Sequence, residues 1–521
     1  MLLPNSINIV KEQNDNVTIH IDNAKSFNLL SESYLTKQIN SVTVRGKGGE
    51  VLYEFFYTEV NTVTRKDGTI ISVTDNDILF DEFNLFFFFI SSEGGEGPTT
   101  TDLPIGNFVF VNPLGNDVTA ERENFHKPFL TLNAAKNAAA SGDTIYVYGG
   151  TYIEFQPLHK DGVKWNFTGK PVVNFAGSRC FSDDLTGQTE ISVKGDAIFN
   201  HIGIGQFVNI QFDSIINFEC YSITALGQQI FWLGTGTGII NVLTKIEVTL
   251  VNRCIQLESN ARYLINIDDI FCNSLIGGVS NAINLRSTFV GDTIINARRI
   301  RLERAFGSTL TTSPNVSGKL TLNVSDKISF DHATPTLIQA NQAITHLSGL
   351  LIINGNIDGG KGIAIDIQTQ FPTVAPFLKT LEHNGEAYND GTQPVIFYGA
   401  DAGFWAAGKS TLKLNGKYST SNDKTICQGG TAGNKLTVKG RVENQSQSVA
   451  TAGVFIEETG TVIFEDCVII MDNSVGLREC ISSNIPQNIK LFTSLGSNKN
   501  ASANITNLIA ANNLTVDAEY E

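Results

Sequence analysis

The 521-residue chain is short of charged side chains, since Asp, Glu, Lys and Arg make up only 17% of it. A surface with so few charges must be built from Asn, Ser, Thr and Gly. These residues favour turns and solvent-facing strand positions over exposed helices. Long helical patterns are rare as well, so the sequence predicts an all-β protein.

Long apolar runs and a basic surface are also lacking. No run of 18 apolar residues exists, so we expect no membrane insertion. The first residues, "MLLPNSINIVKEQND", have neither the basic nor the apolar segment of a signal peptide, and we expect none. A net charge of −15 disfavours nucleic acid and anionic lipid as partners, because both are bound through clustered Lys and Arg.

No CxxC or CxH spacing occurs, and the seven histidines lack the spacing of zinc ligands. We therefore expect no cofactor. The odd number of cysteines and their apolar neighbours predict reduced, buried thiols rather than a disulfide framework. The cysteines are Cys180, Cys220, Cys254, Cys272, Cys427, Cys467 and Cys480.

Residues 1–90 are predicted to form a small antiparallel β-rich module for attachment or oligomerisation. β-Branched and aromatic runs such as "VLYEFFYTEV" alternate there with glycine pairs. Four consecutive phenylalanines, Phe86–Phe89, must be covered on both faces, either by the core of the module or by another chain. Residues 91–106 are rich in Gly, Pro, Ser and Thr and are predicted to be a linker.

A short helix is predicted over residues 129–140, where apolar residues recur at helical spacing. Gly142 can supply a left-handed stop, and Asp143 can hydrogen-bond to backbone in the turn that follows. The next segment, "TIYVYGG", alternates as a strand does. We therefore expect a helix that lies flat on the strand that follows it.

A loose repeat then runs along the chain. Its phrases begin at residues 293, 319, 350, 411, 435 and 461, and the one interval of 61 residues is close to twice the others. Each phrase holds short alternating strands, broken by Asn or Gly at the expected corners. Such a period predicts stacked coils of parallel strands around a continuous core, a β-solenoid over residues 107–483. The helix would cover its open first coil, and residues 484–521 would form a C-terminal cap.

The segments "GND" at 115–117, "PFLTLNAAKNAAASGDTI" at 128–145 and "YVYGGTY" at 146–152 resemble the first coil of right-handed parallel β-helices of the pectate-lyase-like type. Gly149 departs from the pattern, because the family often has Pro there. The matching residues are Pro128, Phe129, Leu132, Ala135, Gly142, Asp143, Ile145, Val147, Gly150 and Tyr152.

This resemblance implies a fold that serves polysaccharide lyases, glycoside hydrolases and non-enzymatic phage tailspikes and fibres. Phage members commonly join an N-terminal attachment module to a trimeric β-helix, and the layout here is similar. We therefore expect a homotrimeric virion protein of the tail-fibre or tailspike type, made in the host cytoplasm. Its β-helix would bind host surface glycan or neighbouring virion proteins. The alternative is a polysaccharide depolymerase, either a lyase or a glycoside hydrolase.

A hydrolase requires paired carboxylates. The candidates are the neighbours Asp183 and Asp184, and the neighbours Asp268 and Asp269. Adjacent strand residues point to opposite faces, so neither pair is expected to form an acid/base couple by itself.

The one dense basic patch, "NARRIRLERAFG" at 296–307, could instead bind an acidic glycan. If Ile300 and Leu302 point inward, Arg299 and Arg301 point outward together with Glu303. A solvated face or an interchain ion-pair strip is the competing interpretation.

Two further sets are weaker candidates. Asp75, Asp77, Asp81 and Glu82 form an acidic cluster, but it lacks the glycine and final glutamate of an EF-hand, so we expect no metal there. Trp165, Trp232 and Trp405 could stack on sugar rings or belong to the core.

Overall fold

The computed structural model divides the chain into two compact units, Met1–Gly106 and Asn107–Glu521. In the first unit it describes six strands between residues 7 and 72. In the second it describes most of residues 107–517, with gaps between strands. The longest gaps are 184–189, 274–280, 333–340, 368–378, 400–409, 445–453, 472–480 and 499–504.

The first unit contains one six-stranded sheet: β1 (Ile7–Lys11), β2 (Asn16–Ile21), β3 (Ser41–Arg45), β4 (Val51–Phe56), β5 (Thr62–Thr64) and β6 (Ile70–Ser72). Its neighbours pair antiparallel except β2 and β3, which are parallel, so the expectation of a purely antiparallel module was wrong at that pair. Phe86–Phe89 and the linker 91–106 lie outside the described residues. The attachment role stays a prediction.

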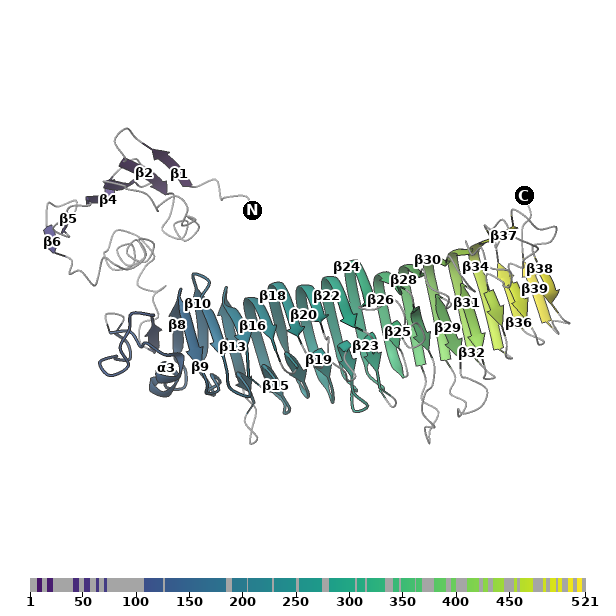
Figure 1. The fold of residues 1–521 in the computed structure, drawn as a ribbon, viewed down its shortest axis with the longest axis horizontal. Coiled ribbons are helices and arrows are strands. Elements are labelled where there is room, and N and C mark those ends of the chain that lie inside the picture. Colours follow the sequence, from purple (N-terminus) through teal and green to yellow (C-terminus); the bar gives the residue numbers. More distant parts are fainter. Residues whose placement is uncertain are drawn as a thin grey trace. The chain divides into compact units, whose positions relative to one another are not determined.

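The second unit is a right-handed parallel β-solenoid, as its sequence predicted (Figure 1). From β16 (Ser214–Ala225) to β35 (Ile481–Ser483) each coil contributes one long strand to a 20-stranded sheet and one short strand to a 13-stranded sheet. Each strand pairs in parallel with its equivalents in the coils before and after it. Successive repeats are thus neighbours in space.

The first strands of the solenoid are β7 (Phe108–Val111), β8 (Thr144–Tyr148), β9 (Thr151–Glu154), β10 (Lys164–Thr168), β11 (Val172–Phe175), β12 (Phe181–Ser182), β13 (Glu190–Gly195), β14 (Ile198–His201) and β15 (Val208–Ile210). The long strands are β16 (Ser214–Ala225), β18 (Gly236–Thr249), β20 (Ala261–Asn273), β22 (Asp292–Arg304), β24 (Lys319–His332), β26 (Gly349–Asp358), β28 (Lys379–Asn389), β30 (Ser410–Thr420), β32 (Asn434–Asn444) and β34 (Gly460–Met471). The short strands are β17 (Phe231–Leu233), β19 (Arg253–Leu257), β21 (Asn281–Leu285), β23 (Gly307–Thr312), β25 (Asn341–Thr345), β27 (Ile363–Ile367), β29 (Ile396–Gly399), β31 (Ile426–Gly429), β33 (Val454–Ile456) and β35 (Ile481–Ser483).

The core consists of inward-pointing side chains stacked coil upon coil. Ile265 of β20, Ile295 of β22 and Leu322 of β24 are in register, and all three are fully buried. Phenylalanines such as Phe199 and Phe218 fill the earlier coils. Each fully buried aliphatic or aromatic side chain contributes about 1.5–3 kcal/mol. Short strands that could not fold alone are therefore stable together.

The long strands bend part-way along their length. The pairing register shifts between Val242 and Lys245 of β18, and between Ala297 and Arg299 of β22. Such bulges bend a strand and redirect the side chains near them. Glycines occupy the bend in later coils: Gly355, Gly385, Gly416 and Gly440 all have positive φ. The expected use of glycine at the corners is confirmed.

The predicted helix is shorter than expected. Helix α3 spans Leu132–Ala138, because Phe129 instead forms a parallel bridge with Val111 of β7. The buried carboxylate of Glu154 accepts a hydrogen bond from the Leu132 amide at 2.6 Å, and this fixes the helix to the end of β9. The strand after the helix, β8, was expected to begin the solenoid, and this was wrong, because β7 lies upstream of the helix and pairs in parallel with β8. The lid role of the helix stays a prediction.

The C-terminal segment continues the solenoid. The strands β36 (Asn488–Phe492), β37 (Leu495–Asn498), β38 (Ile505–Leu508) and β39 (Asn513–Asp517) pair in parallel with earlier coils. Parallel pairing thus extends past residue 483, where a separate cap over 484–521 was expected.

Within the described part of the chain, no helix is long and apolar enough to cross a membrane. Five cysteines there are buried and form no disulfide, as predicted. They are Cys180, Cys220, Cys254, Cys272 and Cys467.

Candidate functional site

A line of seven asparagines crosses the outward face of seven neighbouring long strands. In this amide ladder each Nδ2 donates to the Oδ1 of the asparagine in the preceding coil, at 2.7–2.8 Å. The members are Asn241, Asn266, Asn296, Asn323, Asn354, Asn384 and Asn415. Asparagine was expected at the corners of the coils, and Asn354, Asn384 and Asn415 do directly precede the bend glycines. The expected reason, tolerance of left-handed backbone, was wrong. None of these residues is among the described positions with positive φ, and their side chains pair instead.

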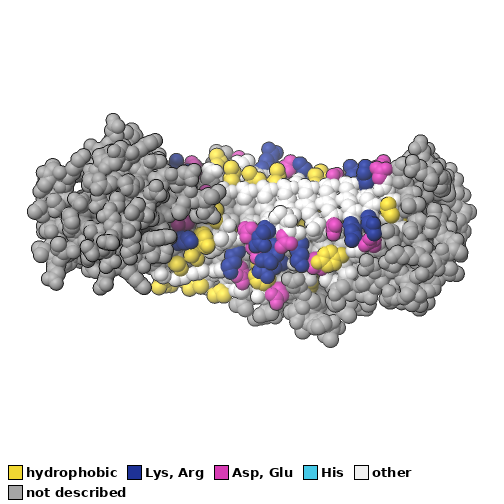
Figure 2. All heavy atoms as spheres, turned by 90° about the horizontal axis from the view of Figure 1, so that it is seen from above, with side chains coloured by type: hydrophobic (Ala, Val, Ile, Leu, Met, Phe, Trp, Pro, Cys, Tyr) yellow, Lys and Arg dark blue, Asp and Glu magenta, His cyan; other side chains and the backbone are white. Residues whose placement is uncertain are grey.

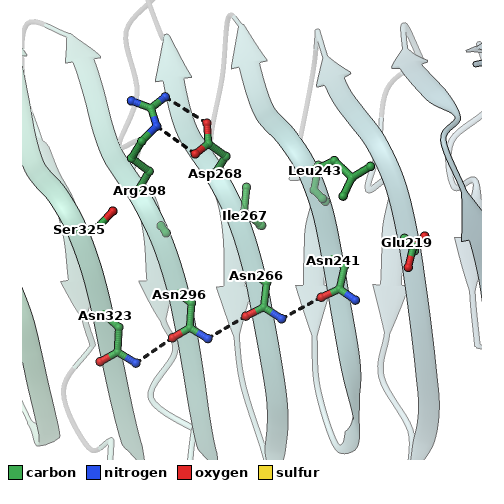
Figure 3. A pocket seen from close by; sticks show the side chains of 12 residues that line it. Glu219, Asn241, Leu243, Asn266, Ile267, Asp268, Asn296, Arg298, Asn323 and Ser325 are labelled. Carbon is green, nitrogen blue, oxygen red and sulfur yellow. Dashed lines mark hydrogen bonds and ion pairs between the residues drawn. The ribbon is translucent and has the colours of Figure 1, made fainter. Parts of the chain in front are cut away.

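A groove of about 690 Å³ lies between the ladder and the bend of the long strands, open to solvent. Figure 3 shows Asn241, Asn266, Asn296 and Asn323 in one line along it. The ladder supplies its polar side, and Leu243, which is 56% exposed, supplies apolar surface. Sequence reasoning missed this site. The available signal was an asparagine after the first apolar alternation in four of the six repeated phrases, those that begin at residues 293, 319, 350 and 411.

An ion pair borders the groove opposite the ladder (Figure 3). Arg298 donates from Nε and Nη2 to the two carboxylate oxygens of Asp268, at 2.9 and 3.0 Å. Both side chains are nearly half exposed, so solvent screens the pair and its contribution to stability is small. The two charges neutralise each other at the groove edge.

On the other side of the ladder lies a second regular column. Each member stands two residues before a ladder asparagine and points outward with it, because strand side chains alternate. We call the set Ile239, Leu264, Ile294, Thr321 and Ile352 the aliphatic column. Ile239 and Ile294 are 43% and 38% exposed. A solvent-facing strip of aliphatic carbon thus borders the amides.

Beyond the bend, charged side chains of both signs gather over the middle of the described face (Figure 2). Arg299 and Arg301 both donate to Oδ2 of Asp269, at 2.8 and 3.3 Å. The Arg301 guanidinium also lies 3.7 Å from the ring centroid of Phe271. Ile300 and Leu302 are buried, so the predicted outward direction of the two arginines is confirmed. Their role in binding an acidic glycan stays a prediction.

The next coils continue this arrangement. We call the set Asp268, Asp269, Arg298, Arg299, Arg301, Lys327 and Asp358 the charged strip. Lys327 and the Tyr388 hydroxyl both donate to Oδ2 of Asp358, at 2.9 and 2.6 Å. Burial and the hydrogen bond to Asp358 raise the pKa of Tyr388 to about 12. The phenol therefore stays protonated at neutral pH and donates to the carboxylate.

The expected opposite directions of Asp268 and Asp269 were wrong. Both contact outward-pointing arginines, because the strand bends at this point and alternation fails. Three strand spacings separate Asp269 from the level of Asp358, or about 14 Å. Inverting glycosidases hold their carboxyl groups only about 6.5–9.5 Å apart. These carboxylates do not have the spacing of an acid/base pair.

Asp183 is a buried residue in the turn after β12 (Phe181–Ser182). It accepts hydrogen bonds from the backbone amides of Gln211 and Phe212, which lie in the next coil. Burial raises its pKa, and these donors oppose that rise. Asp183 therefore joins two coils and is not exposed to a ligand. Asp184 and the predicted cation loop, Asp75, Asp77, Asp81 and Glu82, lie outside the described residues.

The tryptophans give no open stacking platform in the described residues. Trp165 is 2% exposed and stacks on Phe167 in the core. Trp232 is half-buried, with the Arg286 guanidinium 5.6 Å from its ring. Trp405 lies outside the described residues.

No family model, curated protein or solved structure matches this chain. The fold, the groove and the charged strip are therefore the basis for assigning a function.

Proposed function

We propose that this protein is a phage virion protein of the tail-fibre or tailspike type, whose solenoid binds glycan on the host surface. The amide ladder beside an open groove is the observation that carries the binding role. Ligand sites combine apolar surface with a few placed polar groups, and the groove has both. The ladder repeats its polar groups at every coil, which suits a polymeric ligand.

The virion assignment rests on sequence and on domain organisation. The stretch from Gly115 to Tyr152 resembles pectate-lyase-like β-helices. A separate N-terminal unit, Met1–Gly106, precedes the solenoid and would contact other tail proteins. As in phage relatives of this layout, three chains would assemble into a homotrimer. Light scattering on the purified chain tests that state, and a monomer would contradict it.

Binding without cleavage is the favoured form of this function. In the charged strip, Asp268 and Asp269 are each held by arginine, and Asp358 accepts from Lys327 and Tyr388. A general acid or a nucleophile must be a carboxylate that can reach the glycosidic bond and lies at the right distance from a second carboxylate. The ion pairs of these three carboxylates, and the wide spacing of Asp269 and Asp358, do not favour that role.

A glycan array probed with the purified full chain tests the binding role. We expect a defined subset of glycans to be retained, with no release of reducing ends or unsaturated products. Cleavage that disappears in Asp268→Asn or Arg301→Ala would replace this proposal with the depolymerase alternative. Retention of no glycan would instead favour contacts with neighbouring virion proteins. Electron microscopy of the particle, with antibody against the chain, would locate it at the tail.

A further inference from the structure

We infer that the groove binds an uncharged, linear glycan, laid along the amide ladder across several coils. The inference rests on the glycan binding proposed above and specifies its ligand class. It concerns the ladder from Asn241 to Asn354, where the aliphatic column runs beside it.

The hydrogen-bonding groups of this stretch suit sugar hydroxyls. A carboxamide offers two N–H donors and two acceptor lone pairs. An internal ladder residue such as Asn296 uses one donor and one lone pair on its neighbours. It keeps one of each, and this pair recurs at each strand spacing of about 4.8 Å. A hydroxyl both donates and accepts, so a row of hydroxyls matches a row of such amides.

Apolar surface lies on both sides of the amides. Ile239 and Ile294 of the aliphatic column are exposed on one side, and Leu243 is exposed on the groove side. Sugar rings carry C–H faces as well as hydroxyls, and these faces can pack on exposed aliphatic carbon. A ligand on the ladder would therefore contact polar and apolar groups together at most coils, with Thr321 as the polar exception in the aliphatic column.

The charges exclude an acidic ligand from this stretch. The charged residues that line the groove are Glu219, Asp268 and Arg298, and the last two neutralise each other. An anionic polymer would meet Glu219 and no unpaired cation. Further along, the ion pair of Glu382 and Lys413 takes the place of the aliphatic column. The uncharged stretch therefore ends near Asn354.

Affinity electrophoresis of the full chain in gels containing soluble polysaccharide tests this inference. The uncharged probes are mixed-linkage β-glucan, xylan and galactomannan, and the acidic probes are polygalacturonate and alginate. We expect retardation by at least one uncharged polymer and by neither acidic one. High salt should leave the retardation unchanged, because no ion pair with the ligand is involved.

Two variants test the location of the site. Asn296→Asp removes the donor and adds a charge in the middle of the ladder, and we expect affinity to fall about tenfold or more. Ile294→Ser removes an exposed aliphatic contact and leaves the ladder intact, so it keeps the test decisive if Asn296→Asp does not fold. The matched control is Asn200→Asp, since Asn200 also pairs with an asparagine, Asn174, but away from the groove.

The outcomes separate the inference from the proposed function. Retardation by acidic polymers alone, lost in Arg301→Ala, would overturn the uncharged ligand and leave glycan binding standing. Unchanged affinity in both Asn296→Asp and Ile294→Ser would overturn the groove as the site. Retardation by no polysaccharide would overturn both the inference and the proposed function.

Discussion

Inside the core of the solenoid, Nδ1 of His383 lies 2.9 Å from the hydroxyl of Tyr418. The other ring nitrogen, Nε2, lies 2.9 Å from the Gly355 carbonyl oxygen. The neutral imidazole with its proton on Nε2 satisfies both contacts, donating to Gly355 and accepting from Tyr418. Protonation of Nδ1 would remove the acceptor.

Stability should therefore fall as the pH is lowered from 7 to 4. Burial lowers the pKa of His383 to about 4, although the bond to Gly355 opposes this, whereas an unfolded histidine titrates near 6.5. Between these values the unfolded state binds more protons, so unfolding is favoured as the pH falls. The loss from this group is about 3 kcal/mol at most. Urea unfolding of the wild type and His383→Gln at pH 7.5 and pH 5 measures it. An equal pH dependence in both proteins would show that His383 is not responsible.

The ion pair of Arg122 and Asp143 provides a second test of how stability depends on pH. The guanidinium donates to both oxygens of the buried carboxylate, at 2.6 and 2.7 Å. Burial alone would raise the pKa of Asp143, but Arg122 and the Ala140 amide outweigh it and lower the pKa. This stabilisation is present above the ordinary aspartate pKa and is lost as the pH falls through the folded value.

We expect Arg122→Ala to lower the free energy of unfolding at pH 7 by more than the loss of an exposed ion pair does, because it leaves the buried carboxylate of Asp143 without its guanidinium partner. The difference from the wild type should shrink in acid. Lys127→Ala is the matched control, because its ion pair with Glu121 is about half exposed on both sides. Urea titrations should show less than about 0.5 kcal/mol for the control. Equal losses of unfolding free energy in Arg122→Ala and Lys127→Ala would show that the ion pair of Arg122 and Asp143 contributes no more than an exposed pair.

Glycine at the bend of a long strand should not tolerate substitution where the backbone of the preceding coil packs against it. Gly440 has a φ of +109°, and a Cβ there would lie 2.3 Å from the Gly416 carbonyl oxygen of the preceding coil. Gly142 has a similar φ of +94°, but a Cβ there would have no atom within 4 Å.

Gly142→Ala should therefore cost only the left-handed backbone penalty, about 1 kcal/mol. Gly440→Ala adds a backbone clash, and we expect a loss of about 3 kcal/mol or more. Thermal unfolding followed by circular dichroism compares the two. Similar melting temperatures for both variants would show that the coils can separate to accept a methyl group.

The buried thiols should resist alkylation in the folded protein. Burial raises the pKa of Cys467 to about 12, and it raises the pKa of Cys180 and Cys220 well above the ordinary value. Because the thiolate is the reactive form, iodoacetamide at pH 8 should leave these three residues unmodified until urea is added. Peptide mass spectrometry identifies the labelled sites. Rapid labelling of Cys180 without denaturant would show that its coil opens.

The solenoid could be predicted from the sequence because each repeated phrase corresponds to one long strand. The interval of 61 residues between the phrases at 350 and 411 also has its explanation. The strand β28 begins at Lys379 within that interval, and its centre, "EHNGEAY", carries polar and small residues that hid the repeat.

The candidate site was harder to predict, because strict alternation fails where the strands bend. Asp268 and Asp269 both face outward, although neighbours on a straight strand do not. Arg298 likewise projects beside Arg299. The pattern of apolar residues identifies the side chains that point inward. Hydrogen bonds between coils depend in addition on the register in which neighbouring strands pair. Four of the six repeats carry an asparagine at nearly the same offset, and only the alignment of the strands showed that their amides meet.

If the ladder binds glycan as proposed, the one-amide-per-coil arrangement links the evolution of this protein to its recognition chemistry. Coils interact chiefly with their immediate neighbours, so a duplicated segment of one repeat length can be inserted without rebuilding the rest. Each such duplication would bring its own asparagine and its own outward aliphatic residue. The number of ligand positions can thus rise or fall in whole steps while the chemistry of each position is inherited unchanged.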